Sequence, residues 1–197
     1  RSGSASQEAL LSKEVTIIGC GAVGSAIAAQ LVRAGICNLV LVDYKRVRAS
    51  DMQRHIYFRR DDLGNYKTAA LACYLKRINS SCSIRTYNEK IVPHSNLGEI
   101  ISLRTDLVVN SADEPYIGHI TVKLGRFLWP KEIALYVAGG FDAHSMSTGE
   151  LIANGMTPCV DCCTNTFKVA LKDWVPTYVP TVDERTSVLS GGAGGIA

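Results

Sequence analysis

Three glycines near the amino end of the chain have a spacing that suits phosphate binding. Gly19, Gly21 and Gly24 form a G-x-G-x-x-G pattern directly after the apolar or β-branched residues 15–18. In such a turn the first glycine permits a tight bend and the second lets backbone N–H groups approach a phosphate. The third allows the next helix to pack against the strand, and the N-terminus of that helix directs its positive dipole end at the anion. The alternative is a glycine-rich turn that binds nothing.

An acid lies where such a site would hold a ribose. Asp43 ends the apolar run 38–43. It lies about 20 residues beyond the glycines, the distance at which Rossmann-type folds place the acid that binds ribose hydroxyls. This spacing predicts a nucleotide-binding βαβ unit and weighs against an empty turn.

Basic residues follow the same run. Lys45, Arg46 and Arg54 lie past the carboxyl end of an expected parallel strand, where open α/β sheets bind ligands. Arginines there suit phosphate, but for Lys45 and Arg46 we prefer the simpler interpretation of a solvated loop. Lys67 falls in the first turn of the expected helix 66–79, where a cation opposes the helix dipole. That placement indicates an anionic ligand, with a solvated lysine as the alternative.

A second strand-end acid comes later in the chain. Asp113 follows the buried run 106–110, so we expect it at the same sheet edge as the glycine turn. Glu114 and Pro115 come next, and they also permit Asp113 to act as a helix N-cap.

Two cysteines have metal-ligand spacing. Cys159 and Cys162 form a C-x-x-C pair, which is half of a tetrahedral zinc site, and Cys163 offers an alternative sulfur. A complete site needs two more ligands, and no second pair follows before Ala197. Alone, the pair is compatible with a metal, a redox pair or chance.

Composition narrows the class of protein. The chain has 197 residues, 47% hydrophobic and 20% charged, as in one globular domain. A formal charge of +3 and the lack of a basic run argue against nucleic acid. No apolar run approaches the roughly 20 residues of a membrane span. Seven cysteines without a disulfide framework favour a reducing compartment, so we expect a cytoplasmic protein.

Apolar runs alternate with helical periodicity, which predicts a doubly wound, Rossmann-like α/β sheet. Strands are expected at 15–18, 38–43, 83–87, 106–110, 133–137 and 148–153, and helices at 7–14, 25–33, 66–79, 97–103 and from 115 towards 129. We expect one domain over 1–197, with a tag-like tail at 1–7 and a crossover loop at 164–186. The chain ends as a new helix begins, so we expect a further C-terminal part.

The order of these motifs resembles the adenylating domain of the ubiquitin-activating superfamily, which includes ThiF and MoeB. The motifs are IIGCGAVG, LVD, SDMQRHIYF, DLGNYKT, VVNSAD and PCVDC, collinear over residues 8–163. Their combination is far more specific than any one of them. Within the family, IIGCG, VVNSADEP and PCVDC look most like the MccB-type enzymes, which adenylate a short peptide.

The resemblance implies an ATP-dependent adenylyltransferase and a role for each matching residue. Gly21 would approach the ATP phosphates, and Asp43 would hold the ribose. Arg54 and Lys67 would bind the triphosphate, and Asp113 would hold Mg²⁺. In adenylation a carboxylate attacks the α-phosphorus and pyrophosphate leaves, so catalysis is mostly positioning and charge neutralisation.

Three departures from the family pattern stand out. Asp51 is placed in the nucleotide site, but the family usually has Asn there, so a negative charge is added near the phosphates. His55 stands where Gln is usual. The family's N-terminal arginine, often lent by a partner subunit, has no match, and we do not assign its role to Arg1.

The resemblance also implies partners and a second metal. It favours structural Zn²⁺ at Cys159 and Cys162, with the other two ligands beyond Ala197. It implies a homodimer, because ThiF, MoeB and MccB pair through this domain. The superfamily's thioester cysteine would follow residue 163, where no cysteine occurs. That absence favours a peptide substrate over thioester relay to a carrier protein.

We therefore expect an enzyme that adenylates a carboxyl or amide group of a peptide, as in the biosynthesis of ribosomal peptide antibiotics. One alternative is activation of a ubiquitin-like sulfur-carrier protein of the ThiS/MoaD type. Another is a non-catalytic binding subunit of the same fold, motivated by Asp51 and the missing arginine. An NAD-dependent dehydrogenase would use the same glycines but leave Arg54, Lys67 and Asp113 without a task.

Overall fold

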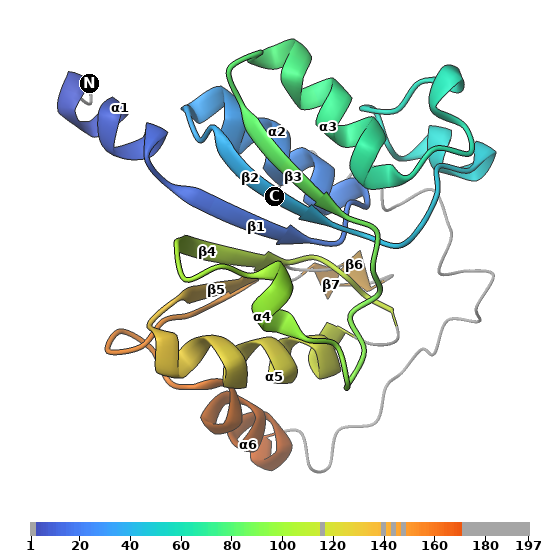
Figure 1. The fold of residues 1–197 in the computed structure, drawn as a ribbon. Coiled ribbons are helices and arrows are strands. Elements are labelled where there is room, and N and C mark those ends of the chain that lie inside the picture. Colours follow the sequence, from blue (N-terminus) through green and yellow to red (C-terminus); the bar gives the residue numbers. More distant parts are fainter. Residues whose placement is uncertain (1–2, 115–116, 139–140, 143–144, 147–148, 171–197) are drawn as a thin grey trace.

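A computed structural model describes residues 3–114, 117–138, 141–142, 145–146 and 149–170. Its main sheet has the strand order β3-β2-β1-β4-β5-β8 (Figure 1). The parallel strands are β1 (Glu14–Ile18), β2 (Asn38–Val42), β3 (Ser83–Tyr87), β4 (Thr105–Asn110) and β5 (Ala134–Val137). Strand β8 (Glu150–Ile152) pairs antiparallel with β5, and β6 (Phe141–Asp142) pairs with β7 (Ser145–Met146).

Helices cover both faces of this sheet (Figure 1). One face carries α2 (Ala22–Ala34) and α3 (Lys67–Ile78), and the other carries α4 (Leu97–Ile100) and α5 (Ile117–Leu128). Helix α6 (Val160–Ala170) packs on α5, and α1 (Ser4–Leu11) precedes β1. Short 3₁₀ turns are η1 (Ala49–Gln53), η2 (Arg60–Asp62) and η3 (Trp129–Lys131). The predicted doubly wound α/β class is confirmed.

Two apolar cores explain why the central strands are continuous apolar runs. Because side chains alternate along a strand, Leu39 and Leu41 enter the core under α2 and α3. Val40 and Val42 enter the opposite core under α4 and α5. All four side chains are buried, as expected for parallel strands covered on both faces.

The chain reverses its direction across the sheet between β1 and β4. It runs from β1 outwards to β2 and β3 and then returns to β4, on the other side of β1. The backbone N–H of Ser111, just after β4, donates to the carbonyl oxygen of Ile18 at 2.8 Å. The ends of β1 and β4 therefore meet at a topological switch point, the usual ligand site of open α/β sheets.

The first helix lies three residues closer to the N-terminus than the sequence predicted. The helix expected at 7–14 spans Ser4–Leu11, so most of the expected tail at 1–7 is helical from Ser4 onwards. Its sequence, SASQEALL, is rich in good helix formers. Glu14 is instead the first residue of β1, because its backbone pairs with Asn38 and Thr105 on the two neighbouring strands.

The structure also differs from the carboxyl-terminal expectation where that segment is described. Helix α6 continues to Ala170, so the first part of the crossover loop expected at 164–186 is helical. The rest of that loop, and the glycine-rich end of the chain, lie outside the described residues. Within the described part of the chain, no helix is long and apolar enough to cross a membrane.

Candidate functional site

The glycine turn has the conformation and close packing that only glycine allows. Gly19 has a φ of +93°, and a Cβ there would lie 2.7 Å from the backbone nitrogen of Ala112. A Cβ on Gly24 would overlap the carbonyl oxygen of Gly19 and lie 2.5 Å from Ser111 Oγ. Helix α2 therefore starts pressed against both the turn after β1 and the loop after β4.

Gly21 plays a different part, because a Cβ there would not collide and would lie 3.9 Å from its nearest neighbour, His55 Nε2. It is the N-cap of α2, and within the described residues no side chain caps this helix. Gly21, Ala22 and Val23 line a pocket at the switch point. Uncapped N–H groups and the positive end of the helix dipole make this part of the pocket suited to an anion.

Asp43 is fixed beside the same turn. Its Oδ2 accepts a hydrogen bond from the Cys20 backbone N–H at 2.8 Å, and its Oδ1 accepts one from the Lys45 N–H at 2.8 Å. These bonds hold the carboxylate in the pocket lining. Burial, and then the charge of Asp43, raise the pKa of Cys20, so Cys20 is a packed thiol rather than a reactive one.

Lys67 and Arg54, the two cations predicted to bind phosphate, both contact the buried carboxylate of Asp51. Lys67 Nζ lies 3.0 Å and Arg54 Nη2 3.3 Å from Asp51 Oδ1. The Arg48 backbone N–H donates to Asp51 Oδ2 at 2.9 Å. Burial acts to raise the pKa of Asp51, but the bonds from Arg48 and Lys67 outweigh it, so that pKa lies below its ordinary value.

This cluster changes two sequence-based interpretations. Asp51 is only 2% exposed. Lys67 and Arg54 line the pocket, whereas Asp51 lies behind them. The negative charge that was expected to face phosphates is therefore matched by two cations. Lys67 lies at the start of α3, where a cation opposes the helix dipole, but Asp51 pairs with its ammonium. The position of Lys67 therefore does not by itself indicate an anionic ligand.

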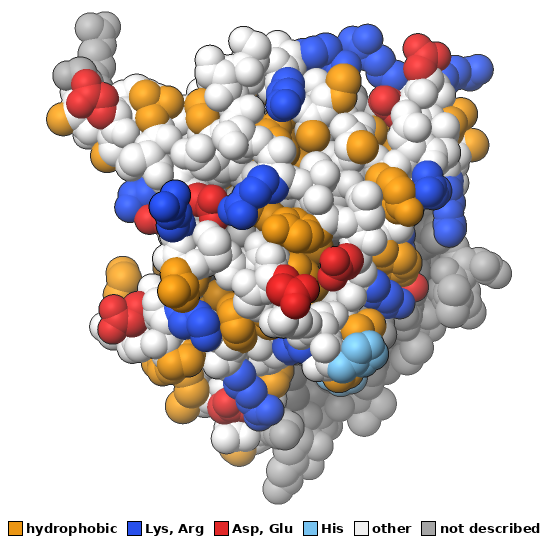
Figure 2. Space-filling view, viewed as in Figure 1, with side chains coloured by type: hydrophobic (Ala, Val, Ile, Leu, Met, Phe, Trp, Pro, Cys, Tyr) orange, Lys and Arg blue, Asp and Glu red, His pale blue; other side chains and the backbone are white. Residues whose placement is uncertain are grey.

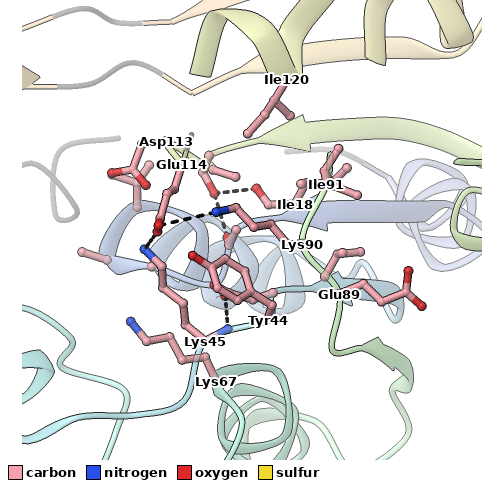
Figure 3. A pocket seen from close by; sticks show the side chains of 18 of the residues that line it. Ile18, Tyr44, Lys45, Lys67, Glu89, Lys90, Ile91, Asp113, Glu114 and Ile120 are labelled. Carbon is pink, nitrogen blue, oxygen red and sulfur yellow. Dashed lines mark hydrogen bonds and ion pairs between the residues drawn. The ribbon is translucent and has the colours of Figure 1, made fainter. Parts of the chain in front are cut away.

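The acids after β4 line the opposite side of the pocket (Figure 3). Asp113 is exposed, and among the described residues no group binds its carboxylate. The structure thus brings Asp113 to the same edge as the glycine turn, as expected. Helix α5 is described from Ile117 onwards, and the N-cap alternative for Asp113 stays untested.

Glu114 lies in a cluster of polar side chains that was not predicted from the sequence. It pairs with Lys45 and lies 3.6 Å from Lys90 Nζ (Figure 3). It also accepts a hydrogen bond from Tyr44. The bonds from Lys45 and Tyr44 lower the pKa of Glu114 to about 2. The preferred interpretation of Lys45 as a solvated loop residue was therefore wrong, because this side chain lines the pocket. Arg46 instead stacks on the Tyr66 ring outside the pocket, 3.9 Å from its centre.

The cysteine pair lies away from this pocket, at the start of α6. The Sγ atoms of Cys159 and Cys162 are 3.4 Å apart. Two Zn–S bonds of about 2.3 Å at a tetrahedral angle would separate the sulfurs by about 3.8 Å, so a small adjustment would fit zinc. Hydrogen bonds from Cys162 lower the pKa of Cys159. Among the described residues, no group of three or more potential ligands surrounds the pair.

The surface carries mixed charge. Figure 2 shows acidic and basic side chains interspersed over the face seen in Figure 1, in keeping with the formal charge of +3.

A doubly wound sheet with a glycine turn at its switch point, followed by an acid at the end of the next strand, defines a Rossmann-type α/β protein. The chain belongs to the ThiF family, whose model matches residues 1–194. The family resemblance of the sequence is thereby confirmed.

Known relatives agree with this assignment. The ubiquitin-like modifier-activating enzyme 5 of Drosophila sechellia is 36% identical over 116 residues, which is 54% of this chain and 28% of that protein. E. coli MccB solved with ATP has a TM-score of 0.74 at 20% identity, over 97% of this chain and 54% of that chain. E. coli TcdA, a tRNA N6-threonylcarbamoyladenosine dehydratase solved with ATP, has a TM-score of 0.63 at 24% identity. This match covers 70% of this chain and 55% of the TcdA chain. The chain thus spans about a quarter of the first relative and about half of the two solved proteins.

Proposed function

We propose that this chain is the catalytic domain of an ATP-dependent adenylyltransferase that activates a carboxyl or amide group of a peptide. The observation that carries the proposal is the convergence of four different groups on one pocket: the uncapped start of α2, the ribose-type acid Asp43, the cations Lys67 and Arg54, and the free carboxylate of Asp113. Membership of the ThiF family supports the same activity.

Each group has a task in the reaction. The N–H groups at the start of α2 and the Lys67 ammonium bind phosphate oxygens, and Asp43 accepts hydrogen bonds from the ribose hydroxyls. Arg54 stabilises charge that moves onto pyrophosphate as the substrate oxygen attacks the α-phosphorus. Because both cations are already held by Asp51, little reorganisation is needed when charge develops.

The donor set also fits a magnesium ion. Mg²⁺ prefers one or two carboxylates plus phosphate oxygens, and Asp113 offers a carboxylate in the pocket lining. The neighbouring Glu114 is engaged by Lys45 and Lys90, which leaves Asp113 as the ligand. When bound, the ion would neutralise triphosphate charge.

The substrate proposal has two sources of support. One MccB structure with a TM-score of 0.75 contains AMPCPP and MccA, and the resemblance of the sequence motifs to MccB-type enzymes implies a peptide substrate. The sequence has no cysteine after Cys163, which disfavours thioester relay within this chain. Activation of a ubiquitin-like protein is the second candidate, because the relatives from insects are ubiquitin-like modifier-activating enzymes.

Mass spectrometry tests the proposed reaction. The full-length protein is incubated with ATP, Mg²⁺ and a panel of peptides and ubiquitin-like proteins, and matched samples omit ATP or replace it with AMPCPP. We expect an AMP adduct, or a product formed through it, on a peptide together with release of pyrophosphate. An adduct on the ubiquitin-like proteins alone would select the second candidate. Release of phosphate without any adduct would reject adenylation.

We further propose a homodimer and a cytoplasmic location. The resemblance to ThiF, MoeB and MccB, which pair through this domain, supports the dimer. Seven cysteines, all free thiols in the structure, suit a reducing compartment. Light scattering on the active protein tests the dimer, and an active monomer would exclude it.

A further inference from the structure

His55 is a buried histidine at the back of the pocket whose role is not explained by the groups described above. Its side chain is 2% exposed. Its ring stacks on Phe58, with the ring centres 5.2 Å apart. Its Nδ1 lies 3.0 Å from the backbone carbonyl oxygen of Asp51. Because a carbonyl oxygen only accepts, Nδ1 carries the hydrogen, and the neutral ring presents Nε2 as an unprotonated acceptor.

No group among the described residues bonds to that Nε2 atom. Buried polar atoms nearly always have a partner, so this one points to a ligand. The atom is directed at the phosphate-binding turn, because a Cβ on Gly21 would lie 3.9 Å from it. His55 also lines the same pocket as Gly21, Lys67 and Arg54.

The charges around His55 favour an anion at Nε2. Lys67 and Arg54 are the cations that face it, Asp51 is the acid that faces it, and the start of α2 lies across from it. Burial, and then the charge of Lys67, lower the pKa of His55 to about 4. The imidazole is therefore neutral at about pH 7 before a ligand binds.

A phosphate oxygen and a neutral Nε2 are both acceptors, so they cannot bond without a hydrogen. The negative charge of a triphosphate favours the imidazolium form, which has a donor at Nε2 as well as at Nδ1. We propose that His55 is a further nucleotide-binding residue, whose Nε2 takes up a proton from solvent when the triphosphate enters and donates it in a hydrogen bond to a phosphate oxygen. The proton returns to solvent when the phosphate leaves. This inference rests on the proposed binding of ATP.

Calorimetry measures the proton directly. ATP·Mg²⁺ is titrated into the full-length protein at about pH 7 in two buffers with different ionisation enthalpies, and the difference in heat gives the protons taken up. The key variant is His55→Gln, whose amide donates a hydrogen bond without exchanging a proton. The matched control is His94→Gln, at an exposed histidine outside the pocket lining.

We expect the wild-type protein and His94→Gln to take up about one proton more than His55→Gln. Protonation of the nucleotide itself cancels in this difference. Equal uptake by all three proteins would overturn the inference, while the proposed ATP site would survive because binding is still seen. Absence of any ATP binding by the wild-type protein would instead reject the proposed function, and this inference with it.

Nuclear magnetic resonance keeps the inference testable even where His55→Gln does not fold. In wild-type protein with ¹⁵N-labelled histidine, saturating ATP·Mg²⁺ should move the Nε2 resonance of His55 from the position of an unprotonated nitrogen to that of a protonated one. A resonance that stays at the unprotonated position in the complex would overturn the inference.

Discussion

Asp51 connects most of the charged residues on one side of the pocket. Its carboxylate contacts Lys67, Arg54 and His55 and is almost fully buried. Removing one member of such a cluster leaves an uncompensated buried charge. The family's usual Asn would keep a hydrogen-bond acceptor but not the charge, so Asp51 fixes both cations more firmly than Asn would.

The buried His55 predicts a pH dependence of stability. Its pKa in the folded protein is about 4, below the ordinary value of 6.5, so the unfolded chain binds more protons between these values. The free energy of unfolding should therefore fall as the pH drops from about 6.5 to 4, by up to ~1.4 kcal/mol per pH unit. The lowered pKa of Asp51 adds a loss in the same direction at still lower pH.

Urea unfolding at several pH values checks this prediction. His55→Gln should have a flatter pH profile than the wild type between about pH 6.5 and 5, and His94→Gln should keep the wild-type slope. Identical slopes in His55→Gln and the wild type would show that this histidine is not held neutral by the fold.

A substitution at Asp113 tests the proposed role of this carboxylate in catalysis. Asp113→Asn keeps the size of the side chain and any N-cap role but removes the charge that would bind Mg²⁺. We expect the variant to fold and keep much of its affinity for nucleotide, while adenylation falls by ~100-fold or more. Asp61→Asn, at an exposed acid outside the pocket lining, should keep wild-type activity. Wild-type pyrophosphate exchange by Asp113→Asn would make Asp113 a structural residue only.

The sequence correctly indicated those pocket residues that lie at the end of a strand or at the start of a helix. Asp43 and Asp113 follow apolar strands and Lys67 begins a helix, so topology alone brings them to one edge. The partners of Glu114 could not be predicted, because Lys45 lies far away in sequence and their contact depends on side-chain packing. The unpaired Nε2 of His55 had no sequence signal beyond its departure from the family motif.

At the scale of elements, the strands of the sheet were well predicted because each central strand is a short apolar run buried on both faces. The errors lie where local patterns compete with tertiary contacts. Glu14 belongs to β1 because strands on both sides pair with it. Helix α6 extends past residue 163 with α5 as its packing surface, a contact that the weak periodicity of this segment did not indicate.

The start of α2 yields a prediction about two glycines only three residues apart. In Gly24→Ala the new methyl group would collide with the carbonyl oxygen of Gly19, and we expect a loss of ~1–3 kcal/mol in the free energy of unfolding. In Gly21→Ala the new methyl group would make only an ordinary contact, 3.9 Å from His55 Nε2, so its stability should stay within about 1 kcal/mol of the wild type. Urea denaturation compares the two, and equal losses would show that α2 is not pressed against the turn.

At the scale of the whole molecule, the described residues contain a C-x-x-C pair whose spacing suits half of a zinc site. We predict that Cys159 and Cys162 bind Zn²⁺ in the full-length protein with two further ligands from outside the described residues. Elemental analysis should give about one zinc per chain. Replacing both cysteines by serine should remove the metal, whereas Cys73→Ser, at an exposed cysteine of α3, should retain it. A folded, metal-free wild-type protein would contradict the prediction.

We propose that the pocket at the switch point binds ATP with Mg²⁺, and calorimetric titration of the full-length protein measures this binding. We expect ATP·Mg²⁺ to bind and NAD to bind much more weakly, because the cations and Asp113 suit a triphosphate. Asp43→Ala should lose ~1.5–3 kcal/mol of ATP binding, about a 10- to 150-fold rise in Kd, and Asp61→Ala should bind as the wild type does. Binding of NAD in preference to ATP, or an Asp43→Ala variant with unchanged ATP affinity, would contradict the account.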